Sequence, residues 1–336
     1  MAERLVFFGE LLLRLTAPGH ELLLQSARFD VHVGGAEANV ATGLARLGHV
    51  TAMVSTVTPN ALGLGALSAL RAHGIDCSGV QQRPGRMGLY FLAAGAGLRA
   101  SEIVYDRAHS SFAATPATAY DWDSLLAGAS LLHLSGITPA LGPLTREAAL
   151  VAAKAARRLG VPVSFDGNYR AMLWDSWDGQ PRETLSELVS QADILFGNHR
   201  DIGLLLGQHF DASTPAARRA AAEAAFAAFP ALQTIASTSR ELLSADHHRL
   251  GARIDQRQTF AEAPPLEVTS IVDRIGAGDA FAAGVLHALL QGGDAAAMAR
   301  TGLALAALKH SLPGDASLFG QADLDAILQG TLDVRR

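Results

Sequence analysis

The chain has 336 residues, of which 49% are hydrophobic and 18% are charged, and its formal net charge is −5. This length and composition allow a sizeable core in one large domain or two smaller ones, and they exclude intrinsic disorder. The charges are mixed in sign along the chain, so no basic stripe points to nucleic acid or anionic lipid as a partner. A small polar ligand fits this composition better.

The single cysteine, Cys77, excludes an internal disulfide framework, and the first residues, MAERLVFFGE, lack the pattern of a signal peptide. The most apolar stretches, residues 280–290 and 301–308, do not reach the roughly 20 residues of a membrane span. We therefore expect a cytoplasmic protein with no membrane partner, and we expect buried helices in these two stretches.

Short apolar runs of strand length alternate with segments that have helical spacing. The runs lie at residues 5–8, 51–54, 131–134, 161–165, 194–196 and 234–236, and the helical segments between them include 38–47, 62–72, 145–159 and 182–189. Such alternation predicts an α/β fold with a mostly parallel sheet covered by helices on both faces.

Two stretches break this alternation. Residues 11–33 contain two strand-like runs around Pro18-Gly19, and residues 86–107 contain two more around Gly95-Ala96-Gly97. Each stretch predicts a pair of short strands, and together they could form a small lid over a ligand. The pattern fits equally well with two strand pairs that extend the edge of the main sheet. We find no internal repeat or long linker, so we expect one domain over residues 1–336.

A glycine loop, Gly276-Ala277-Gly278-Asp279, leads into the apolar helix that is predicted near the C-terminus. Glycines let backbone N–H groups approach an anion closely, and the N-terminus of a helix favours negative charge. The Asp279 carboxylate could accept the proton of an attacking hydroxyl in phosphoryl transfer. The same residues would also make a tight turn with an acid that complements the helix dipole.

Residues 273–284, DRIGAGDAFAAG, closely resemble the C-terminal signature of the ribokinase-like (PfkB) carbohydrate kinases, and residues 34–48, GGAEANVATGLARLG, resemble the N-terminal signature of that family. Two signatures about 240 residues apart in the right order are much harder to obtain by chance than one. The resemblance covers nearly the whole chain. It implies a ribokinase-like three-layer fold, a central mostly parallel sheet flanked by helices, and a small β lid.

The resemblance also implies roles for the glycine loop. Asp279 is expected to be the catalytic base, and the backbone amides of Ala277, Gly278 and Asp279 are expected to form the anion hole, with Gly276 in the same loop. ATP and Mg²⁺ are the implied cofactors. A monovalent cation is a further option that the sequence does not decide.

Asn198 and Asp201 follow a predicted strand at a helix start and match the Asn-x-x-Glu element of the family, with Asp in place of Glu. The match implies that Asn198 contacts ATP and that both residues serve Mg²⁺, with a water molecule between the shorter Asp201 side chain and the metal as an option. An N-cap at Asn198 with a first-turn acid at Asp201 would account for both residues equally well.

Residues 237–241 stand where many relatives carry a Gly-rich nucleotide loop, but they contain no glycine. Thr238 and Arg240 could still bind phosphate through a hydroxyl and a guanidinium. Residues 306–315 resemble the adenine-side region of the family, which makes Lys309 a candidate for ATP contact. A solvated cation at a helix end is the alternative for Lys309.

The lid and the sheet edge must determine the substrate class, because the phosphate machinery is shared across the family. Arg107 and Arg170 could receive a carboxylate, for which a guanidinium fork is the natural partner. These segments resemble the 2-keto-3-deoxygluconate kinases, which implies that the substrate contacts are Gly34, Tyr90, Tyr105, Arg107 and Arg170. The tyrosines could instead be ordinary strand residues, and the arginines could pair with Asp106 or Asp166. Asp166 could also cap the next turn, and we do not place it in the site.

The expected reaction is therefore ATP-dependent phosphorylation of the terminal hydroxyl of a sugar acid, 2-keto-3-deoxygluconate. A kinase for fructose or another ketose would use the same base. A non-catalytic regulator that binds a sugar acid is the alternative from another class, because residues 237–241 lack glycine and Asp201 replaces Glu. A lid with an exposed apolar face would allow a homo-oligomer, but the pattern does not show such a face.

Overall fold

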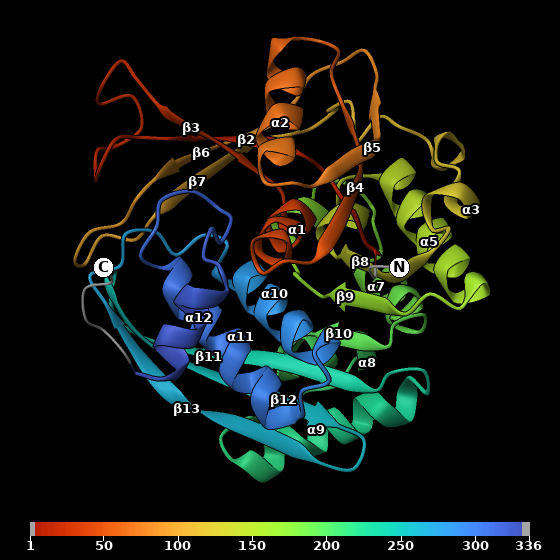
Figure 1. Ribbon diagram of the computed structural model, residues 1–336, viewed down its shortest axis with the longest axis vertical. Helices are drawn as coiled ribbons and strands as arrows, with labels where there is room; N and C mark the ends of the chain where they lie inside the picture. The colour runs from red at the N-terminus through yellow and green to blue at the C-terminus, as the bar shows by residue number, and fades with distance from the viewer. Residues whose placement is uncertain (1–3, 331–336) are drawn as a thin grey trace.

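The computed structural model describes residues 4–330 and contains two β-sheets in this part of the chain. The larger sheet has nine strands in the order β13-β12-β11-β10-β9-β8-β1-β4-β5. The strands from β5 to β11 pair in parallel, whereas β11, β12 and β13 pair antiparallel at one edge. Helices cover both faces of this sheet (Figure 1), so the predicted three-layer α/β fold is confirmed.

Five of the six predicted apolar runs lie wholly within strands of this sheet, and the run 161–165 overlaps β9 from Val163 onward. The parallel strands are β1 (Arg4–Phe8), β4 (Val50–Val57), β5 (Asp76–Gln82), β8 (Ala129–Ser135), β9 (Val163–Asp166), β10 (Ile194–Phe196) and β11 (Thr234–Ser244). The sequence analysis does not predict β5, β12 (His247–Gln256) or the body of β13 (Phe260–Thr269). Strand β13 carries Pro264 and Pro265, which an edge strand tolerates but which hide the strand pattern.

Two hydrophobic cores separate the sheet from its helix layers. One core includes side chains of α1 (Ala36–Arg46), α2 (Ala61–Ala72), α10 (Ala277–Leu290), α11 (Ala295–Lys309) and α12 (Gln321–Leu328). The other includes side chains of α3 (Trp122–Leu125), α4 (Ile137–Ala140), α5 (Pro143–Leu159), α6 (Ala171–Trp174), α7 (Pro181–Val189), α8 (His199–Leu206) and α9 (Pro215–Ala228). Successive residues of β1 alternate between the cores, with Phe7 in the first and Phe8 in the second. Within residues 4–330, no helix is both long and apolar enough to cross a membrane.

The second sheet has four strands in the order β3-β2-β6-β7 and lies at the upper left in Figure 1. Its strands are β2 (Leu12–Thr16), β3 (Asp30–Gly34), β6 (Gly88–Ala93) and β7 (Glu102–Asp106). Each predicted strand pair is an antiparallel pair, and β2 and β6 join the two pairs in parallel. The alternative that both pairs extend the edge of the main sheet is wrong, because the four strands form a sheet of their own.

The two glycine signatures open two helices, α1 and α10, that pack against each other. A Cβ added at Gly43 would lie 2.9 Å from the Ala283 Cβ, so the helices approach closely at this point. This close approach brings the first turns of both helices together, although they are far apart in the sequence. The candidate active site forms where these two helices begin.

Candidate active site

Asp279 lies in the first turn of α10 and is bound by a residue of α1. The Asn39 Nδ2 atom donates a hydrogen bond of 2.7 Å to Asp279 Oδ2. Burial raises the pKa of Asp279 to about 8, against the effect of this hydrogen bond, and the charges of Asp166, Asp315 and Glu37 contribute to the rise. With such a pKa the group is mostly protonated at pH 7 in the ligand-free chain, and its ionised form is the one that can accept a proton from a hydroxyl.

The loop before Asp279 presents free backbone groups to an open space. Gly276 has a φ of 78°, and a Cβ there would overlap the carbonyl oxygen of Asp315, so only glycine fits. A Cβ at Gly278 would meet nothing within 4 Å. The N–H of Ala277 donates to a carbonyl of the preceding turn, whereas no described residue accepts from the N–H groups of Gly278 and Asp279. Two free amides at a helix N-terminus can receive an anion.

Asn198 and Asp201 form a capping box at the start of α8. The Asn198 Oδ1 atom accepts from the Arg200 N–H at 2.8 Å, and the Asp201 Oδ2 atom accepts from the Asn198 N–H at 2.7 Å. The N-cap alternative is therefore confirmed as their local structure. A role of Asn198 and Asp201 in metal binding stays a prediction. It requires a further metal ligand beside Asp201.

Asp166, at the end of β9, connects the base with the candidate metal residues. Burial raises the pKa of Asp166 to about 7, and the charge of Asp201 adds to this rise. Its Oδ1 atom accepts from the Asn168 N–H at 3.0 Å, so it also caps the next turn, as one of the two alternatives predicted. The charge of Asp201 acts on Asp166, and the charge of Asp166 acts on Asp279, so the structure adds Asp166 to the site.

The pair of Asp166 and Asp201 fits a divalent cation that has further ligands from elsewhere. Mg²⁺ is usually bound by one or two carboxylates, with water and phosphate oxygens completing its coordination. A bound cation would also favour the charged forms of two carboxyl groups whose pKa values are raised by burial. Among residues 4–330, no group of three His, Cys, Asp or Glu side chains could hold a metal alone.

Thr238 and Arg240 are exposed on β11 and point to one face of the main sheet. In the antiparallel register they lie opposite Ala252 and Leu250, respectively. Both of these partners belong to the core that includes α10 and α11. Directly opposed residues share a face, so Thr238 and Arg240 lie on the side of the sheet that carries the anion loop.

Lys309, at the end of α11, is 0% exposed. Its Nζ atom donates to the carbonyl oxygens of Asp273 at 3.3 Å and Leu312 at 3.0 Å. The alternative of a solvated cation is therefore wrong. The ammonium group connects the two loops that flank Gly276, and any effect on a nucleotide acts through these loops.

Three of the predicted substrate residues meet at one end of the second sheet. Tyr90 and Tyr105 lie opposite each other on β6 and β7, with ring centroids 6.1 Å apart. The Tyr90 hydroxyl donates to Asp315 Oδ2 at 2.6 Å. Gly34 adjoins the same carboxylate, because a Cβ there would collide with Asp315 Oδ2. Asp315, which ends the predicted adenine-side segment, thus borders the predicted sugar side.

Arg107 is buried and already has an acidic partner. Its Nε and Nη2 atoms both donate to Glu10 Oε2, at 2.8 and 2.5 Å, and the other Glu10 oxygen accepts from Ser110. The alternative pairing with Asp106 is wrong, because Asp106 pairs with Arg86. Glu10 balances the charge of Arg107 and leaves the Nη1 edge of the guanidinium for a substrate oxygen.

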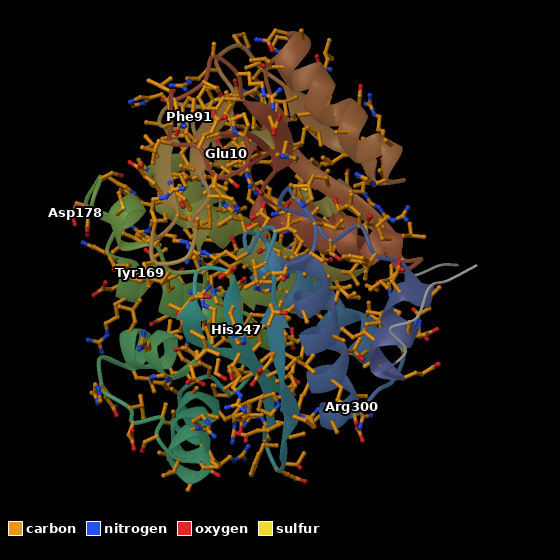
Figure 2. All side chains as sticks on the ribbon, turned by 90° about the vertical axis from the view of Figure 1, so that its left-hand side faces the viewer. Glu10, Phe91, Tyr169, Asp178, His247 and Arg300 are labelled. Atoms are coloured by element: carbon orange, nitrogen blue, oxygen red, sulfur yellow. The ribbon has the colours of Figure 1, made fainter. Side chains whose placement is uncertain are left out.

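Arg170 is exposed and has no acidic partner. Its Nη1 atom donates to the Tyr169 carbonyl oxygen at 3.2 Å, and no described carboxylate lies within ion-pair distance of it. Figure 2 shows Tyr169, the chain neighbour of Arg170, well below Glu10, the partner of Arg107. The guanidinium of Arg170 forms no ion pair at contact distance, but its charge lowers the pKa values of Asp166 and Asp201.

Four residues of this site are missing from the sequence-based prediction: Asn39, Glu10, Asp166 and Asp315. Asn39 and Glu10 carry a weak signal, since Asn39 lies inside the N-terminal signature and Glu10 lies two residues after the first apolar run. Asp315 has no local signal, because its partners Arg14 and Tyr90 are 301 and 225 positions away in the chain. Such contacts follow only from the tertiary fold.

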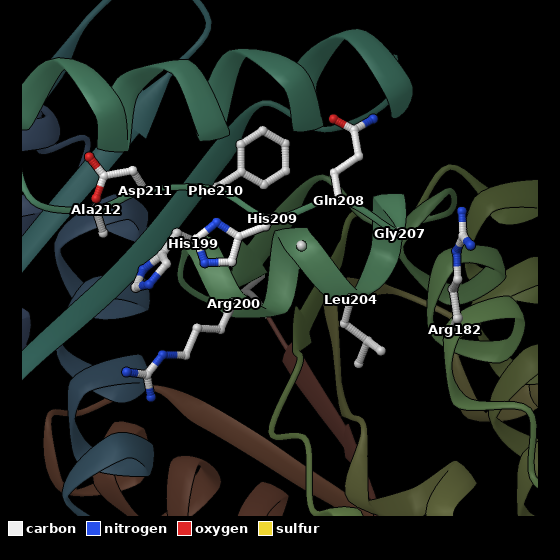
Figure 3. Close-up of a pocket in the computed structure, with 11 residues that line it drawn as sticks. Arg182, His199, Arg200, Leu204, Gly207, Gln208, His209, Phe210, Asp211 and Ala212 are labelled. Carbon is white, nitrogen blue, oxygen red and sulfur yellow. The ribbon is translucent and has the colours of Figure 1, made fainter.

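A cavity of about 650 Å³ lies beside α8 and is separate from this site (Figure 3). Residues 207–212 and several basic side chains line it, and none of the predicted site residues is among them. In Figure 3, Arg182 and Arg200 stand on opposite sides, so their charges do not converge on one point.

Phosphoryl transfer to a hydroxyl needs a base and anion-binding groups on either side of one reacting oxygen, and the first turn of α10 offers both. The fold and this site define a sugar kinase. The sequence profile of the pfkB family carbohydrate kinases matches residues 2–319, and the chain belongs to this family.

Individual relatives are similar over almost their whole length. A 2-dehydro-3-deoxygalactonokinase of Haloferax volcanii is 31% identical over 330 residues, which cover 98% of each chain. The crystal structure of a 2-dehydro-3-deoxygluconokinase from Thermotoga maritima has a TM-score of 0.93 and 35% identity, and the match covers 98% of this chain and 100% of that one. An uncharacterized sugar kinase from Pyrococcus horikoshii in complex with ATP shares the fold, with a TM-score of 0.72 at 23% identity over 93% and 94% of the two chains. The predicted family membership is therefore confirmed.

Proposed function

We propose that the chain transfers the γ-phosphoryl group of ATP, with Mg²⁺, to the terminal hydroxyl of 2-keto-3-deoxygluconate. The observation that carries this proposal is the place of Asp279, a carboxyl group with a pKa of about 8 beside two free amides of a helix N-terminus. The similar proteins from Haloferax volcanii and Thermotoga maritima are named for 2-dehydro-3-deoxy sugar acids, the same class of compound.

In the proposed reaction, Asp279 accepts the proton of the terminal hydroxyl while its oxygen attacks the γ-phosphorus. The new P–O bond forms as the bond to the leaving ADP breaks, and the amides of Gly278 and Asp279 stabilise the charge on the transferring group. Mg²⁺ neutralises charge on the triphosphate when bound, and Asp166 and Asp201 would hold it. Thr238 and Arg240 lie on the face where the nucleotide would bind.

On the sugar side, Arg170 would receive the carboxylate, because its guanidinium is exposed and forms no contact ion pair within residues 4–330. Arg107 would donate to a neutral oxygen of the substrate, since Glu10 balances its charge. Tyr90, Tyr105 and Gly34 would line the remaining wall, and the second sheet would act as the predicted lid within one kinase domain. The Glu10–Arg107 pair also favours a second candidate, a ketose kinase, because a neutralised Arg107 suits an uncharged sugar.

Coupled ADP release across four sugars tests this proposal: 2-keto-3-deoxygluconate, its galactonate epimer, fructose and ribose. We expect kcat/KM for a keto-deoxy acid to exceed that for fructose by at least about tenfold, which is the effect of one additional charged contact with the substrate. A preference for fructose would replace the first candidate with the second. An absence of ADP with every sugar would contradict both.

The monovalent cation stays a prediction. The same assay in tetramethylammonium buffer, with and without potassium, tests it directly.

A further inference from the structure

A buried cluster of two cations and two carboxylates adjoins the anion loop. Its members Arg14, Asp273, Lys309 and Asp315 are 2%, 8%, 0% and 4% exposed, respectively. Arg14 pairs with Asp273 at 2.5 Å and with Asp315 at 2.7 Å, and Lys309 donates to the Asp273 carbonyl oxygen. The formal side-chain charges sum to zero, and the cluster joins β2 to the loop before α10 and the loop after α11.

Asp315 is the member of this cluster that touches both halves of the site. Its Oδ1 atom accepts from Arg14, and its Oδ2 atom accepts from the Tyr90 hydroxyl at 2.6 Å. The same Oδ2 atom fills the space that a side chain at Gly34 would need. Its carbonyl oxygen fills the corresponding space at Gly276, the residue that begins the anion loop. One residue thus contacts the predicted sugar wall and the N-terminus of α10.

We infer that Asp315 is a positioning residue that fixes the distance between the sugar pocket and the anion loop. This inference rests on the proposed function, because it takes Tyr90 and Gly34 as the wall of the sugar pocket. With Asp315 in place, the hydroxyl of a sugar bound in the pocket stays in line with the phosphoryl group bound at the anion loop. A misplacement of about 1 Å between reacting groups can lower a rate by about a hundredfold.

A purely stabilising role is a weaker explanation for this cluster. Burying charged groups is unfavourable unless each is well paired, and an apolar replacement of the same shape is often at least as stable. A buried ion cluster is better explained by a positioning role, in which its directed hydrogen bonds fix the place of one residue relative to another. The two carboxylate oxygens of Asp315 accept from Arg14 and Tyr90, which lie opposite each other on β2 and β6, and this attaches the loop to the second sheet more specifically than an apolar contact would.

The chain offers a matched control for a loss of buried charge. Asp255 on β12 is 3% exposed and pairs with Arg253 at 2.6 Å and with Arg219 at 3.2 Å. It is a buried aspartate with arginine partners, as Asp315 is, and none of the candidate site residues is among its partners. Asp315→Asn and Asp255→Asn therefore make comparable changes in different places.

The test compares kcat, KM and melting temperature of the two variants. We expect Asp315→Asn to lower kcat by about 10- to 100-fold with less than about a threefold change in the KM of the sugar. Asp255→Asn should keep the kcat of the unchanged enzyme even if its melting temperature falls as much as that of Asp315→Asn. A kcat within twofold for Asp315→Asn, or an equal loss in Asp255→Asn, would overturn the inference.

Tyr90→Phe supplies a second readout that does not depend on the folding of Asp315→Asn. The variant keeps the ring and removes one bond to Asp315, so we expect a lower kcat and little change in the KM of the sugar. A rise in KM alone would show that the hydroxyl only binds substrate and would overturn the inference.

Both tests use whichever sugar the unchanged enzyme phosphorylates. If the enzyme phosphorylates none, the proposed function fails. If it is active and Asp315→Asn is equally active, the positioning role fails.

Discussion

The phosphate side and the sugar side of this site are built from different kinds of groups. Gly276, Gly278 and Asp279 provide backbone amides, an open space and one carboxyl group within a single turn. The sugar side instead consists of long side chains from β6, β7 and the loops after β7 and β9, and Arg107 there is already paired with Glu10. The phosphate side can therefore accept an anion as it stands, whereas the choice of sugar depends on which polar groups remain unpaired.

The largest effect should follow from removing the base. Asp279→Asn keeps the shape of the side chain and a bond to Asn39 but cannot accept the proton, so kcat should fall by about 10²- to 10⁴-fold with little change in either KM. Steady-state ADP release measures this, with calorimetric ATP titration to verify that binding is intact. A kcat within about fivefold of the unchanged enzyme would show that Asp279 is not the base.

Two glycines of the same loop should respond in opposite ways. Gly276→Ala forces a side chain onto the Asp315 carbonyl oxygen at a φ of 78°, so the free energy of unfolding should fall by at least about 1–3 kcal/mol. Gly278→Ala meets no atom within 4 Å and should leave this free energy unchanged, while its methyl group hinders the anion and lowers kcat/KM for ATP by about tenfold.

Urea denaturation and ATP titration of the rate separate these two effects. An equal loss of stability in both glycine variants would contradict the described geometry of the loop.

The two arginines of the sugar side should also differ. Arg170→Ala removes an exposed, unpaired guanidinium, so it should raise the KM of the sugar acid by about tenfold without changing the melting temperature. Arg107→Ala leaves Glu10 buried without its partner, which should destabilise the fold by about 3–5 kcal/mol as well as lower activity.

Adding Glu10→Gln to Arg107→Ala should restore part of that stability, because it removes the unpaired charge. If Arg170→Ala raises the KM values of the acid and of fructose equally, Arg170 does not bind the carboxylate.

The smallest effect concerns stability and pH in the absence of ligands. The pKa of Asp279 is about 8 in the folded chain and lies near the ordinary value of 3.8 when unfolded. Between these values the folded state holds a proton that the unfolded state has lost, so this group makes stability fall as the pH rises from about 4 to 8. Asp279→Asn should abolish that contribution and raise the melting temperature by about 1–3 °C at pH 8.

The measurement is a series of melting curves from pH 5 to 9. Parallel curves for the two proteins would show that burial does not raise the pKa of Asp279.

The core of the fold could be predicted from the sequence because its signals are local. The apolar runs at 131–134 and 194–196 are short, buried and bounded by polar residues, and the structure has strands β8 and β10 there. Strand β12 could not be predicted, because it begins with two histidines and an arginine and its burial depends on the helices α10 and α11 that pack over it. Tertiary packing, not local pattern, makes that segment a strand.

The site likewise contains a part that the local sequence predicts and a part that depends on the tertiary fold. The anion loop and its acid stand together in residues 276–279, so one stretch of sequence contains the whole pattern. The partner of Arg107 could not be predicted, because Glu10 lies 97 positions away and the adjacent Asp106 is the more obvious choice. Asp315 is the extreme case, since its contacts with Gly34 and Gly276 exist only after both sheets are in place.

The central claim is that the base and the anion loop act on the terminal hydroxyl of a keto-deoxy sugar acid. Proton-coupled ³¹P NMR of the product tests it most directly. A phosphate ester on the terminal carbon couples to two equivalent or nearly equivalent CH₂ protons, so the account predicts a triplet-like signal that Asp279→Asn fails to produce in the same time. A doublet, from an ester on a secondary carbon, or the same rate of formation with Asp279→Asn, would contradict it.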